Sequence, residues 1–451
     1  ACEFHVPSAA PSAPRDVLQR QQLDVMIHLG SSQPHPRLPA AARSGVWWYR
    51  YSGHRAIAPS VVGLREMLEG EPIAVSELVQ TTADNRERVI YCAIARTIPF
   101  SLRKNRDNIY RKGATFVARK LRDLERYGEA GLVEREAWEI PGSDPGGIST
   151  PGNIAMLAII PRLAGRIALR AWQKLAYVEQ WFVAYRFGDE TGMPTGFDDF
   201  NPMLPPKDRI WADPFPIERD GRYYVFIEEL PFASNKGHIS VVEFDQQGGW
   251  KKPVKVLERD YHMSYPFLFE WQGDLYMLPE TGHNRSVEVY RCHRFPDDWR
   301  LEAVLLEDVN CADATLAQIG ERWWLFVNIG EAGTELYDEL HLYHADQPFG
   351  PWTAHPRNPV KSDARTARPA GNLFWSEGLL YRPAQCCVPL YGAALTLNRV
   401  ELLDEEHFVE QQVARIKADW RPGLLGLHTF NRAGRLSVID GFKRTPRFSL
   451  P

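Results

Sequence analysis

The chain has few cysteines and no long apolar run, and each shortage excludes a class of protein. Six cysteines in 451 residues are too few for a disulfide scaffold, so a reducing cytoplasm is the expected compartment. No Cys-x-x-Cys or His-Glu-x-x-His spacing occurs, so we expect no metal site and no cofactor. The longest uncharged run, Pro145 to Pro161, is shorter than the roughly 20 apolar residues that cross a bilayer. No basic-then-apolar leader stands at Ala1, so we expect no secretory signal.

An excess of positive charge is also missing. Lys and Arg number 53 and Asp and Glu 57, a net charge of −4, so we expect no nucleic-acid partner. The apolar fraction of 44% and the charged fraction of 24% are typical of globular proteins and exclude a disordered chain, a collagen and a coiled coil. The aromatic fraction of 12% suits sheet-rich folds and sugar-stacking clefts.

The length is about three times the roughly 150 residues typical of one domain, so it predicts several domains. We expect a loop or tail over 1–20, an α/β domain over 21–140, a linker and amphipathic helix over 141–204, and a β-propeller over 205–451. The α/β pattern consists of strands over Leu23–Leu29, Gly45–Tyr51 and Val89–Ala95 and helices over Val61–Leu68 and Asn105–Tyr127.

A glycine- and proline-rich linker, Gly142 to Gly152, precedes a helix predicted over Leu163–Tyr185. Basic residues recur at every fourth position of this segment, at Arg162, Arg166, Arg170 and Lys174. One interpretation is an anionic partner such as a membrane surface or a phosphorylated lipid carrier, which implies a cytoplasmic protein with peripheral membrane contact. The other is an amphipathic linker helix whose basic face is simply solvated.

From residue 205 short aromatic and β-branched runs replace the helical spacing, which returns over Glu405–Ile416. Strand–turn–strand segments recur roughly every 50 residues. Their turn glycines are Gly221, Gly273, Gly320, Gly378 and Gly434. Five such hairpins, each extended by further strands, predict a five-bladed β-propeller in a mainly β protein with a smaller N-terminal α/β domain. A β-sandwich is the alternative, but its strands recur at shorter spacing.

Polar residues at the same place in successive propeller repeats converge on a central funnel. Beside the residues named below, these positions hold Glu228, Glu229, Ser264, Thr315, Asn328, Thr429 and Asp440. Asp213, Glu280 and Asp313 are the candidate catalytic residues, because glycosidic-bond chemistry needs a carboxylate base and a carboxylic acid, and a third charge raises the acid's pKa. The alternative is that they cap turns. The candidate substrate-binding residues are Trp211, Tyr265, His262, Asn372, Arg382, Gln385 and His428.

Trp211-Ala-Asp-Pro-Phe and the following Tyr223-Tyr-Val-Phe-Ile-Glu-Glu resemble the first blade of five-bladed propeller glycosidases, the arabinanase and β-xylosidase group. With Lys236-Gly-His-Ile-Ser, Ser264-Tyr-Pro-Phe and Leu278-Pro-Glu, residues 205–445 are more similar still to the N-terminal domain of plant glucosamine inositolphosphorylceramide transferases and their bacterial relatives. The glycosidase resemblance implies Asp213 as general base, Glu280 as general acid and Asp313 as pKa modulator. The order Asp, Glu, Asp differs from that group's Asp, Asp, Glu.

Leu23-Asp-Val-Met-Ile-His-Leu-Gly and Gly45-Val-Trp-Trp-Tyr-Arg resemble a formyltransferase fold, which would cover residues 21–130. That family has an Asn-x-His pair on its active-site strand, where this sequence has Trp48 and Arg50. Of its catalytic groups only an aspartate, at Asp84, has a counterpart. The resemblance implies a non-formylating domain that is structural or recruits substrate.

We therefore expect a carbohydrate-active enzyme that cleaves or forms a glycosidic bond in the funnel, in surface polysaccharide or glycolipid metabolism. Its partner would be a glycan, a sugar nucleotide or a lipid-linked sugar. The alternatives are a non-catalytic glycan-binding propeller with a recruiting N-terminal domain, and a sugar formyltransferase. Hydrolysis or transfer, and inversion or retention, stay open.

Overall fold

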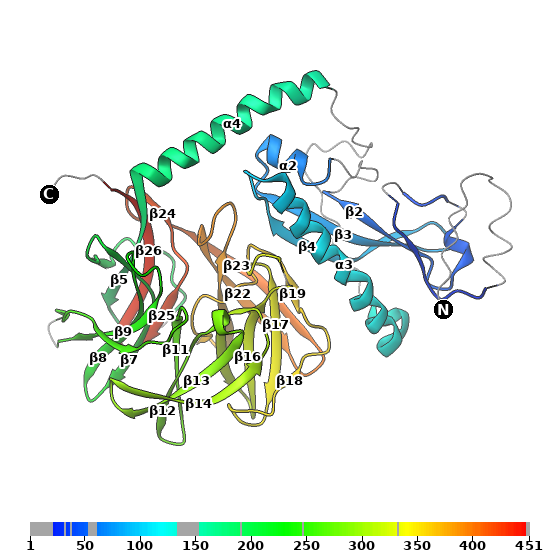
Figure 1. Cartoon of the computed structure of the whole chain (residues 1–451). Helices are drawn as coiled ribbons and strands as arrows, with labels where there is room; N and C mark the ends of the chain where they lie inside the picture. The colour runs from blue at the N-terminus through cyan, green and yellow to red at the C-terminus, as the bar shows by residue number, and fades with distance from the viewer. Residues whose placement is uncertain are drawn as a thin grey trace. The chain divides into compact units, whose positions relative to one another are not determined.

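The computed structural model describes residues 21–30, 33–36, 38–52, 61–132, 153–189, 192–245, 248–331 and 333–447. The predicted tail over 1–20 and the linker Gly142–Gly152 lie outside the described residues. The chain divides into two compact units, Ala1–Ile160 and Pro161–Pro451 (Figure 1). Among the described residues, no helix is both long and apolar enough to span a membrane.

The first unit contains a four-stranded sheet in the order β1-β2-β3-β4. Its strands are β1 (Met26–His28), β2 (Val46–Tyr51), β3 (Ile73–Thr81) and β4 (Glu87–Arg96). β1 and β2 are parallel and the other neighbours antiparallel. The helical segments are η1 (Pro39–Ala41), α2 (Leu64–Glu69), α3 (Leu102–Tyr127) and η2 (Gly128–Gly131). Ser101 caps α3 by accepting a hydrogen bond from the Lys104 N–H, and Phe116 of α3 packs on Trp47 in the core of the sheet.

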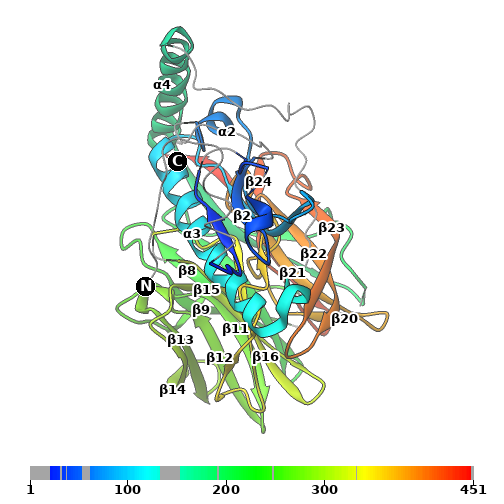
Figure 2. The same ribbon diagram turned by 90° about the vertical axis from the view of Figure 1, so that its right-hand side faces the viewer.

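The second unit begins within helix α4 (Asn153–Ala176), which continues directly into strand β5 (Tyr177–Phe187). In the described residues the rest of this unit consists mainly of five antiparallel sheets, many of whose strands are labelled in Figure 2. The first is β10-β9-β8-β7, with β7 (Arg209–Arg219), β8 (Arg222–Pro231), β9 (His238–Phe244) and β10 (Val254–Leu257). The second is β11-β12-β13-β14, with β11 (Ser264–Trp271), β12 (Asp274–Glu280), β13 (Ser286–Arg294) and β14 (Asp298–Glu307); η3 (Gly282–Asn284) follows β12.

The third sheet is β15-β16-β17-β18, with β15 (Cys311–Ile319), β16 (Arg322–Ile329), β17 (Glu339–Ala345) and β18 (Thr353–Ala354); β19 (Lys361–Ser362) also pairs with β17. The fourth is β20-β21-β22-β23, with β20 (Phe374–Ser376), β21 (Leu379–Cys386), β22 (Ala394–Leu403) and β23 (Phe408–Lys417). The fifth is β24-β26-β5-β6, with β6 (Asn201–Met203), β24 (Leu424–Gly426), β26 (Leu436–Pro446) and β25 (Phe430–Ala433) on β26.

The five predicted hairpins are all present. They are β7–β8, β11–β12, β15–β16, β20–β21 and β25–β26, each an antiparallel pair. Each turn contains its predicted glycine at positive φ, between 51° and 85°. Glycine adopts this left-handed conformation without the steric cost that a Cβ brings, so the repeated glycine is a requirement of the turn.

Two predicted helices differ from the structure. The segment Glu405–Ile416 is not helical, because it contains most of strand β23, which pairs with β22 along its length. Val409 and Val413 are both exposed on this strand, and their four-residue separation imitates helical spacing. The helix predicted over Leu163–Tyr185 ends at Ala176, and the predicted linker segment therefore also contains β5 and β6.

The fifth sheet joins the two ends of the second unit. β5 pairs with β26 from Tyr177 opposite Pro446 to Phe187 opposite Leu436, so the pairing includes every residue of both strands. Phe182 of β5 and Ile439 of β26 lie in one buried apolar cluster. A strand that leaves α4 is thus held by the last described strand of the chain.

Arg382 of β21 and Glu410 of β23 form a buried ion pair whose side chains are 1% and 3% exposed. Burial raises the pKa of Glu410, but Arg382 and Lys361 outweigh it and bring that pKa down to about 2. We expect Glu410→Ala to lower the free energy of unfolding by about 3–5 kcal/mol, because it leaves Arg382 buried without its partner. Denaturant unfolding measures this change.

The matched control for this prediction is Glu401→Ala, which breaks the exposed pair between Arg399 and Glu401. Such pairs contribute at most about 1 kcal/mol. Glu410 stabilises the folded state fully at pH values above its pKa in the unfolded chain, and this stabilisation is lost as the pH falls towards 2. In acid, the two variants should therefore lose similar amounts of unfolding free energy relative to wild type. Equal losses for both variants at neutral pH would contradict the prediction.

Candidate functional site

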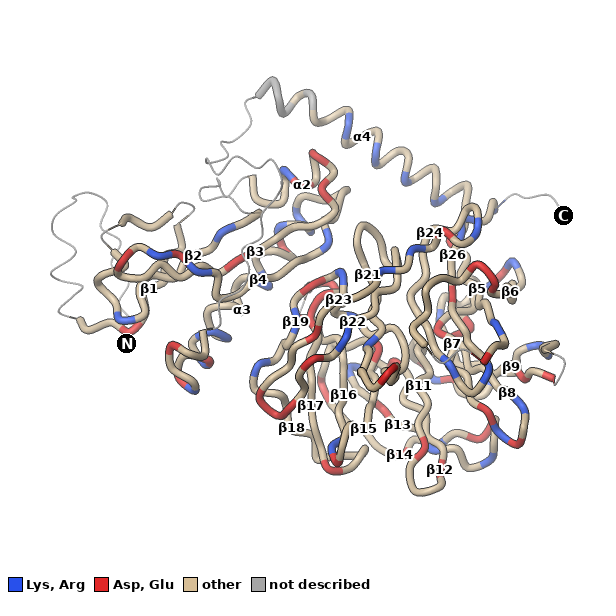
Figure 3. The backbone as a smooth tube through the Cα atoms, turned by 180° about the vertical axis from the view of Figure 1, so that it is seen from behind, with Lys and Arg blue, Asp and Glu red and all other residues tan. Residues whose placement is uncertain are grey.

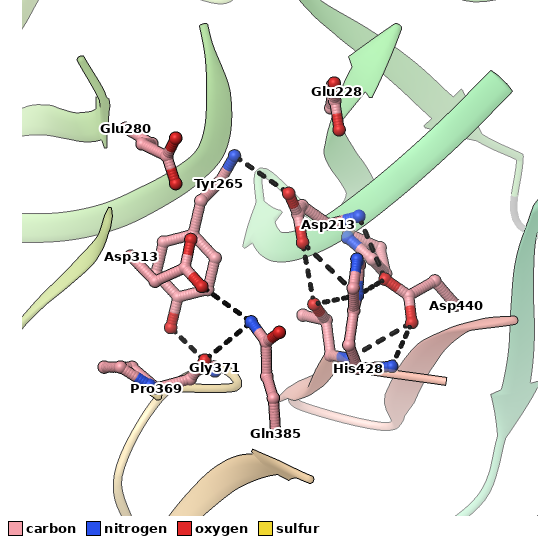
Figure 4. Close-up of polar contacts among 12 residues, drawn as sticks. Asp213, Glu228, Tyr265, Glu280, Asp313, Pro369, Gly371, Gln385, His428 and Asp440 are labelled. Carbon is pink, nitrogen blue, oxygen red and sulfur yellow. Dashed lines mark hydrogen bonds and ion pairs between the residues drawn. The ribbon is translucent and has the colours of Figure 1, made fainter. Parts of the chain in front are cut away.

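The first strands of three sheets carry the same backbone irregularity at the same place. The pairing register shifts between Ala212 and Phe215 in β7, Ser264 and Phe267 in β11, and Ala312 and Thr315 in β15. Inside these bulges Asp213, Tyr265 and Asp313 have φ angles of 50°, 45° and 51°. Bulges redirect side chains, and the three side chains meet in one group in Figure 4.

Asp213 is fixed by groups from two other sheets. Its Oδ2 accepts a hydrogen bond from the Tyr265 N–H at 3.2 Å, and its Oδ1 accepts one from the Thr429 hydroxyl at 2.9 Å. Its own N–H donates to Asp440 Oδ2 at 3.2 Å. Positions up to 227 residues apart in the chain therefore share one hydrogen-bond network.

His428 lies between two of these carboxylates. Its Nδ1 is 2.5 Å from Asp440 Oδ2 and 3.6 Å from Asp213 Oδ1. Burial lowers the pKa of His428, but the charges of Asp440 and Asp213 outweigh it, so the net shift is upwards and favours the imidazolium. Trp181 of β5 stacks on the imidazole with ring centroids 4.0 Å apart.

Asp213, His428 and Asp440 also make a group of possible metal ligands, with ligand atoms within 4.8 Å of one another. Their separation in the sequence explains why no ligand spacing predicted such a group. The Asp440 Oδ1 atom already accepts the backbone N–H groups of His428 and Thr429, at 2.8 and 3.1 Å. Protein hydrogen bonds therefore hold this group together.

Arg368 connects two of the predicted catalytic carboxylates, Glu280 and Asp313. Its guanidinium donates to both oxygens of Asp313, from Nε at 2.5 Å and from Nη2 at 3.3 Å, and to Glu280 Oε2 from Nη2 at 3.4 Å. Gln385 Nε2 adds a hydrogen bond to Asp313 Oδ2 at 2.6 Å. Asp313 thus accepts three hydrogen bonds from Arg368 and Gln385, while Glu280 contacts the same guanidinium less closely.

Glu280 and Asp213 lie in different electrostatic environments. Burial and the negative charge of Asp313 raise the pKa of Glu280 well above its ordinary value, and Arg368 opposes this only in part. Burial also raises the pKa of Asp213 to about 6, against the lowering effect of His428. The centre therefore favours a protonated Glu280 beside an Asp213 that ionises near neutrality.

Glu228 is a further buried carboxylate in this group. Burial and the charges of Asp213 and Glu280 raise its pKa well above its ordinary value. Glu228 Oε1 is 3.3 Å from His262 Nε2, while His262 Nδ1 accepts the Gly237 N–H at 2.9 Å. Burial, together with the nearby His283, lowers the pKa of His262 to about 4. A neutral His262 with an acceptor Nδ1 must carry its proton on Nε2, directed at Glu228.

Tyr265 connects the sheets through its hydroxyl. This oxygen lies 2.9 Å from the Thr315 hydroxyl and accepts the Gly371 N–H at 2.7 Å, and the whole residue is buried. The contacts make Tyr265 a bridge between the second, third and fourth sheets. Its predicted role in substrate binding would need one of these bonds to open.

The structure does not bring three other predicted residues into this group. Trp211 is buried in the apolar cluster with Val225 and donates to Glu229 Oε1 at 3.3 Å. Arg382 is in the ion pair with Glu410. Asn372 lines a cavity of about 280 Å³ whose wall includes Trp375 and none of the site carboxylates. Aromatic and polar residues at funnel-facing positions of the sequence can thus be structural.

Sequence analysis also missed three residues of the site. Arg368 and Tyr391 lie outside the repeated hairpins, and the Arg368 guanidinium carbon is 5.0 Å from the Tyr391 ring centroid. Burial raises the pKa of Tyr391 well above its ordinary value. Trp181 lies in a segment predicted as helix. Repeat alignment could not find these residues, because each comes from a loop or from the strand that closes the fifth sheet.

In the first unit, the positions matched to the formyltransferase pair are engaged in other contacts. Trp48 Nε1 donates to Thr81 Oγ1 at 3.0 Å, and Arg50 Nε donates to Glu77 Oε2 at 2.7 Å. Asp84 lies in the exposed turn between β3 and β4, where it accepts a hydrogen bond from the Thr82 hydroxyl.

The family described as glucosamine inositolphosphorylceramide transferase 1, N-terminal, matches residues 206–423. Glucosamine inositolphosphorylceramide transferase 1 of Oryza sativa subsp. japonica is 36% identical over 206 residues, which are 45% of this chain and 28% of the rice protein. The protein of that name from Arabidopsis thaliana is 30% identical over 206 residues, 45% of this chain and 27% of its own length. The chain therefore spans under a third of the length of these curated relatives.

Two glycoside hydrolases are among the solved structures that resemble this chain. The family 117 enzyme Zg3597 of Zobellia galactanivorans has 14% identity and a TM-score of 0.37, with 58% of this chain and 90% of that chain covered. The catalytic domain of the GH62 α-L-arabinofuranosidase of Coprinopsis cinerea has 11% identity and a TM-score of 0.38, with 61% and 98% covered. These values are too low to transfer any residue role.

The raised pKa of Asp213 makes stability depend on pH. The folded state binds this proton more tightly than the unfolded chain, so ionisation between the ordinary value of 3.8 and about 6 destabilises the fold. Asparagine tolerates the left-handed φ of this position. We expect the free energy of unfolding of Asp213→Asn, relative to wild type, to rise between about pH 4 and pH 6 and then level off.

Unfolding measured across this pH range tests the prediction. Asp308→Asn is the matched control, because Asp308 has a φ of 54° and its side chain is 87% exposed. If the relative stability of Asp213→Asn follows the same course as that of the control, the buried carboxylate does not bind its proton as proposed.

Proposed function

We propose that the second unit is a five-bladed β-propeller and a carbohydrate-active enzyme that forms or cleaves a glycosidic bond at its centre. The observation that supports this most is the convergence of Asp213, Glu280 and Asp313, which three different sheets contribute to one hydrogen-bonded group. Similarity to the N-terminal part of a named glycosyltransferase favours the same class of chemistry.

The proposed reaction uses the different electrostatic environments of Glu280 and Asp213. Protonated Glu280 donates its proton to the leaving oxygen as the glycosidic bond breaks. Asp213 accepts the proton of the incoming hydroxyl as the new bond to the sugar carbon forms. Asp313 is held by Arg368 and Gln385, and its negative charge adds to burial in raising the pKa of Glu280.

The incoming hydroxyl separates hydrolysis from transfer. Water would make the enzyme a hydrolase, and a sugar or lipid hydroxyl would make it a transferase. The curated relatives are named for transfer to inositolphosphorylceramide, so we propose a glycolipid or lipid-linked sugar as the substrate class. The proposal includes a location at a membrane surface on the cytoplasmic side, with contact through the basic residues of α4.

The first unit is proposed to be non-formylating. Indole and guanidinium groups at Trp48 and Arg50, each with a hydrogen-bond partner, offer neither the amide nor the imidazole of the formyltransferase pair. A structural or recruiting role for this unit fits these contacts.

Turnover tests the assignment of the carboxylates. The wild type is incubated with activated sugar donors and inositolphosphorylceramide, and separately with a panel of soluble glycans. We expect Asp213→Asn and Glu280→Gln each to lower turnover at least about 100-fold, because each removes a group that transfers a proton. Retained substrate binding, measured by calorimetry, shows that the site itself survives.

Glu270→Gln is the matched control, since Glu270 is an exposed carboxylate on β11, the strand that also contributes Tyr265. Unchanged turnover in Asp213→Asn would remove Asp213 as the base. Sugar binding without turnover of any substrate by the wild type would favour the glycan-binding module, and turnover of a formyl donor would favour the formyltransferase.

A further inference from the structure

Helix α4 has an apolar face that the described structure leaves uncovered. The exposed large apolar side chains of α4 are Leu175 at 70%, Leu157 at 66%, Ile160 at 60%, Leu169 and Trp172 at 55% each, and Ile167 at 47%. At 3.6 residues per turn, Leu157 and Leu175 lie on the same line of the helix, with Ile160 and Trp172 about 60° and Ile167 about 80° from it. These side chains form one continuous face, and Leu169, about 120° from the line, lies at its edge beside Arg162.

The opposite side of the same helix is basic. Arg162, Arg166, Arg170 and Lys174 follow one another at four-residue spacing, and no Asp or Glu occurs anywhere in Asn153–Ala176. Figure 3 shows these basic positions along α4 without an acidic one between them. A basic face beside an exposed apolar face is typical of helices that bind a negatively charged surface.

The pattern also distinguishes a helix on a membrane from one through it. The described residues contain no helix that could span a bilayer. A helix with a basic face, an apolar face and a tryptophan between them lies in the plane of the headgroups, with its apolar side chains among the upper acyl chains. Long arginine and lysine side chains can reach the phosphates from this depth.

We propose that α4 is an in-plane membrane-binding helix whose ligand is the surface of an anionic lipid bilayer. This deepens the proposed function, since it assigns a partner to the enzyme and a direction from which a lipid-linked substrate arrives. The binding itself does not depend on catalysis.

The end of α4 is firmly attached to the second unit. The Arg447 N–H donates to Ala176 O at 2.9 Å, and Arg447 Nε donates to Lys174 O at 3.0 Å and Tyr177 O at 3.2 Å. These bonds satisfy carbonyl groups at the C-terminus of the helix, where a cation is also favoured by the helix dipole. A helix held in this way transmits its orientation on the bilayer to β5.

The same attachment relates the helix to the candidate site. β5 starts at Tyr177, immediately after α4, and Trp181, four residues further, stacks on His428. Four strand residues span about 13 Å. Trp181, and with it His428, is therefore linked to the end of α4 by about 13 Å of strand.

Vesicle co-flotation tests the proposal with the full chain. The probes are vesicles of phosphatidylcholine and vesicles that contain phosphatidylserine in addition. We expect the wild type to bind the second kind, and to bind it less as salt is added. Replacing the exposed pair Trp172 and Leu175 by glutamine should weaken binding at least about tenfold, because two large apolar side chains no longer leave water.

Charge and apolar contributions are separated by a second variant. Arg162→Gln with Lys174→Gln should weaken binding to the anionic vesicles by about fivefold per residue and leave the weak binding to phosphatidylcholine nearly unchanged. The matched control is Leu301→Gln with Val304→Gln, which removes two exposed apolar side chains from β14. This control should bind both vesicles as the wild type does.

Several outcomes would overturn the proposal. They are a wild type that does not bind anionic vesicles, an apolar variant of α4 that binds them normally, and an apolar variant that instead changes the oligomeric state, which would assign the face to a second copy of the chain. Asp213→Asn should bind vesicles as the wild type does, so failure of the proposed chemistry and failure of the membrane contact remain distinguishable.

Discussion

The antiparallel pairing of β5 with β26 is the constraint on which the site depends. It runs the full length of both strands and brings segments from opposite ends of the second unit into one sheet. Asp440 of β26 and the adjacent His428 and Thr429 thereby come beside Asp213 of the first sheet. Without this pairing the first and fifth sheets would not share a hydrogen-bond network. Asp213 would then lose the contact of its Oδ1 with Thr429 and the contact of its N–H with Asp440.

Carboxylates outnumber cationic groups at the centre of the second unit. Asp213, Glu228, Glu280, Asp313 and Asp440 lie near two cationic groups, Arg368 and His428. A buried charge needs a partner or must be neutralised. Asp313 and Asp440 have close cationic partners, at 2.5 Å in each case. Glu228 and Glu280 lack equally close ones, and burial together with the neighbouring carboxylates raises the pKa of both well above its ordinary value.

Sequence repeats predicted the part of this arrangement that recurs. The turn glycines located all five hairpins, because a left-handed turn conformation selects glycine in each repeat. Alignment of the hairpins then placed Asp213 and Asp313 at equivalent positions, and both occupy the same kind of bulge. Glu280 was found in the same way, opposite Ser264 at the end of β12.

The contacts that do not recur could not be predicted in this way. Arg368 comes from the loop before β20, and nothing in a repeat indicates that its guanidinium reaches Asp313. Arg382 lies at a funnel-facing position by alignment, yet Glu410 of β23, two strands away in the same sheet, binds it. Strand β3 escaped detection because its buried residues include polar Ser76, Glu77 and Gln80, which obscure an apolar pattern. Tertiary partners, which local sequence does not encode, decide such cases.

The repeated bulge also explains why the centre is asymmetric. Left-handed φ at a non-glycine residue costs about 1–3 kcal/mol, and three sheets bear this cost with Asp213, Tyr265 and Asp313. The residues opposite the bulges, Glu228, Glu280 and Asn328, are two acids and an amide.

The fourth sheet contributes Gln385, and the loop before it contributes Arg368. Asp213, Glu228, Glu280 and Asp313 therefore come from the first three sheets, whereas Arg368 comes from the side of the fourth sheet, and Asp440 and His428 come from the side of the fifth.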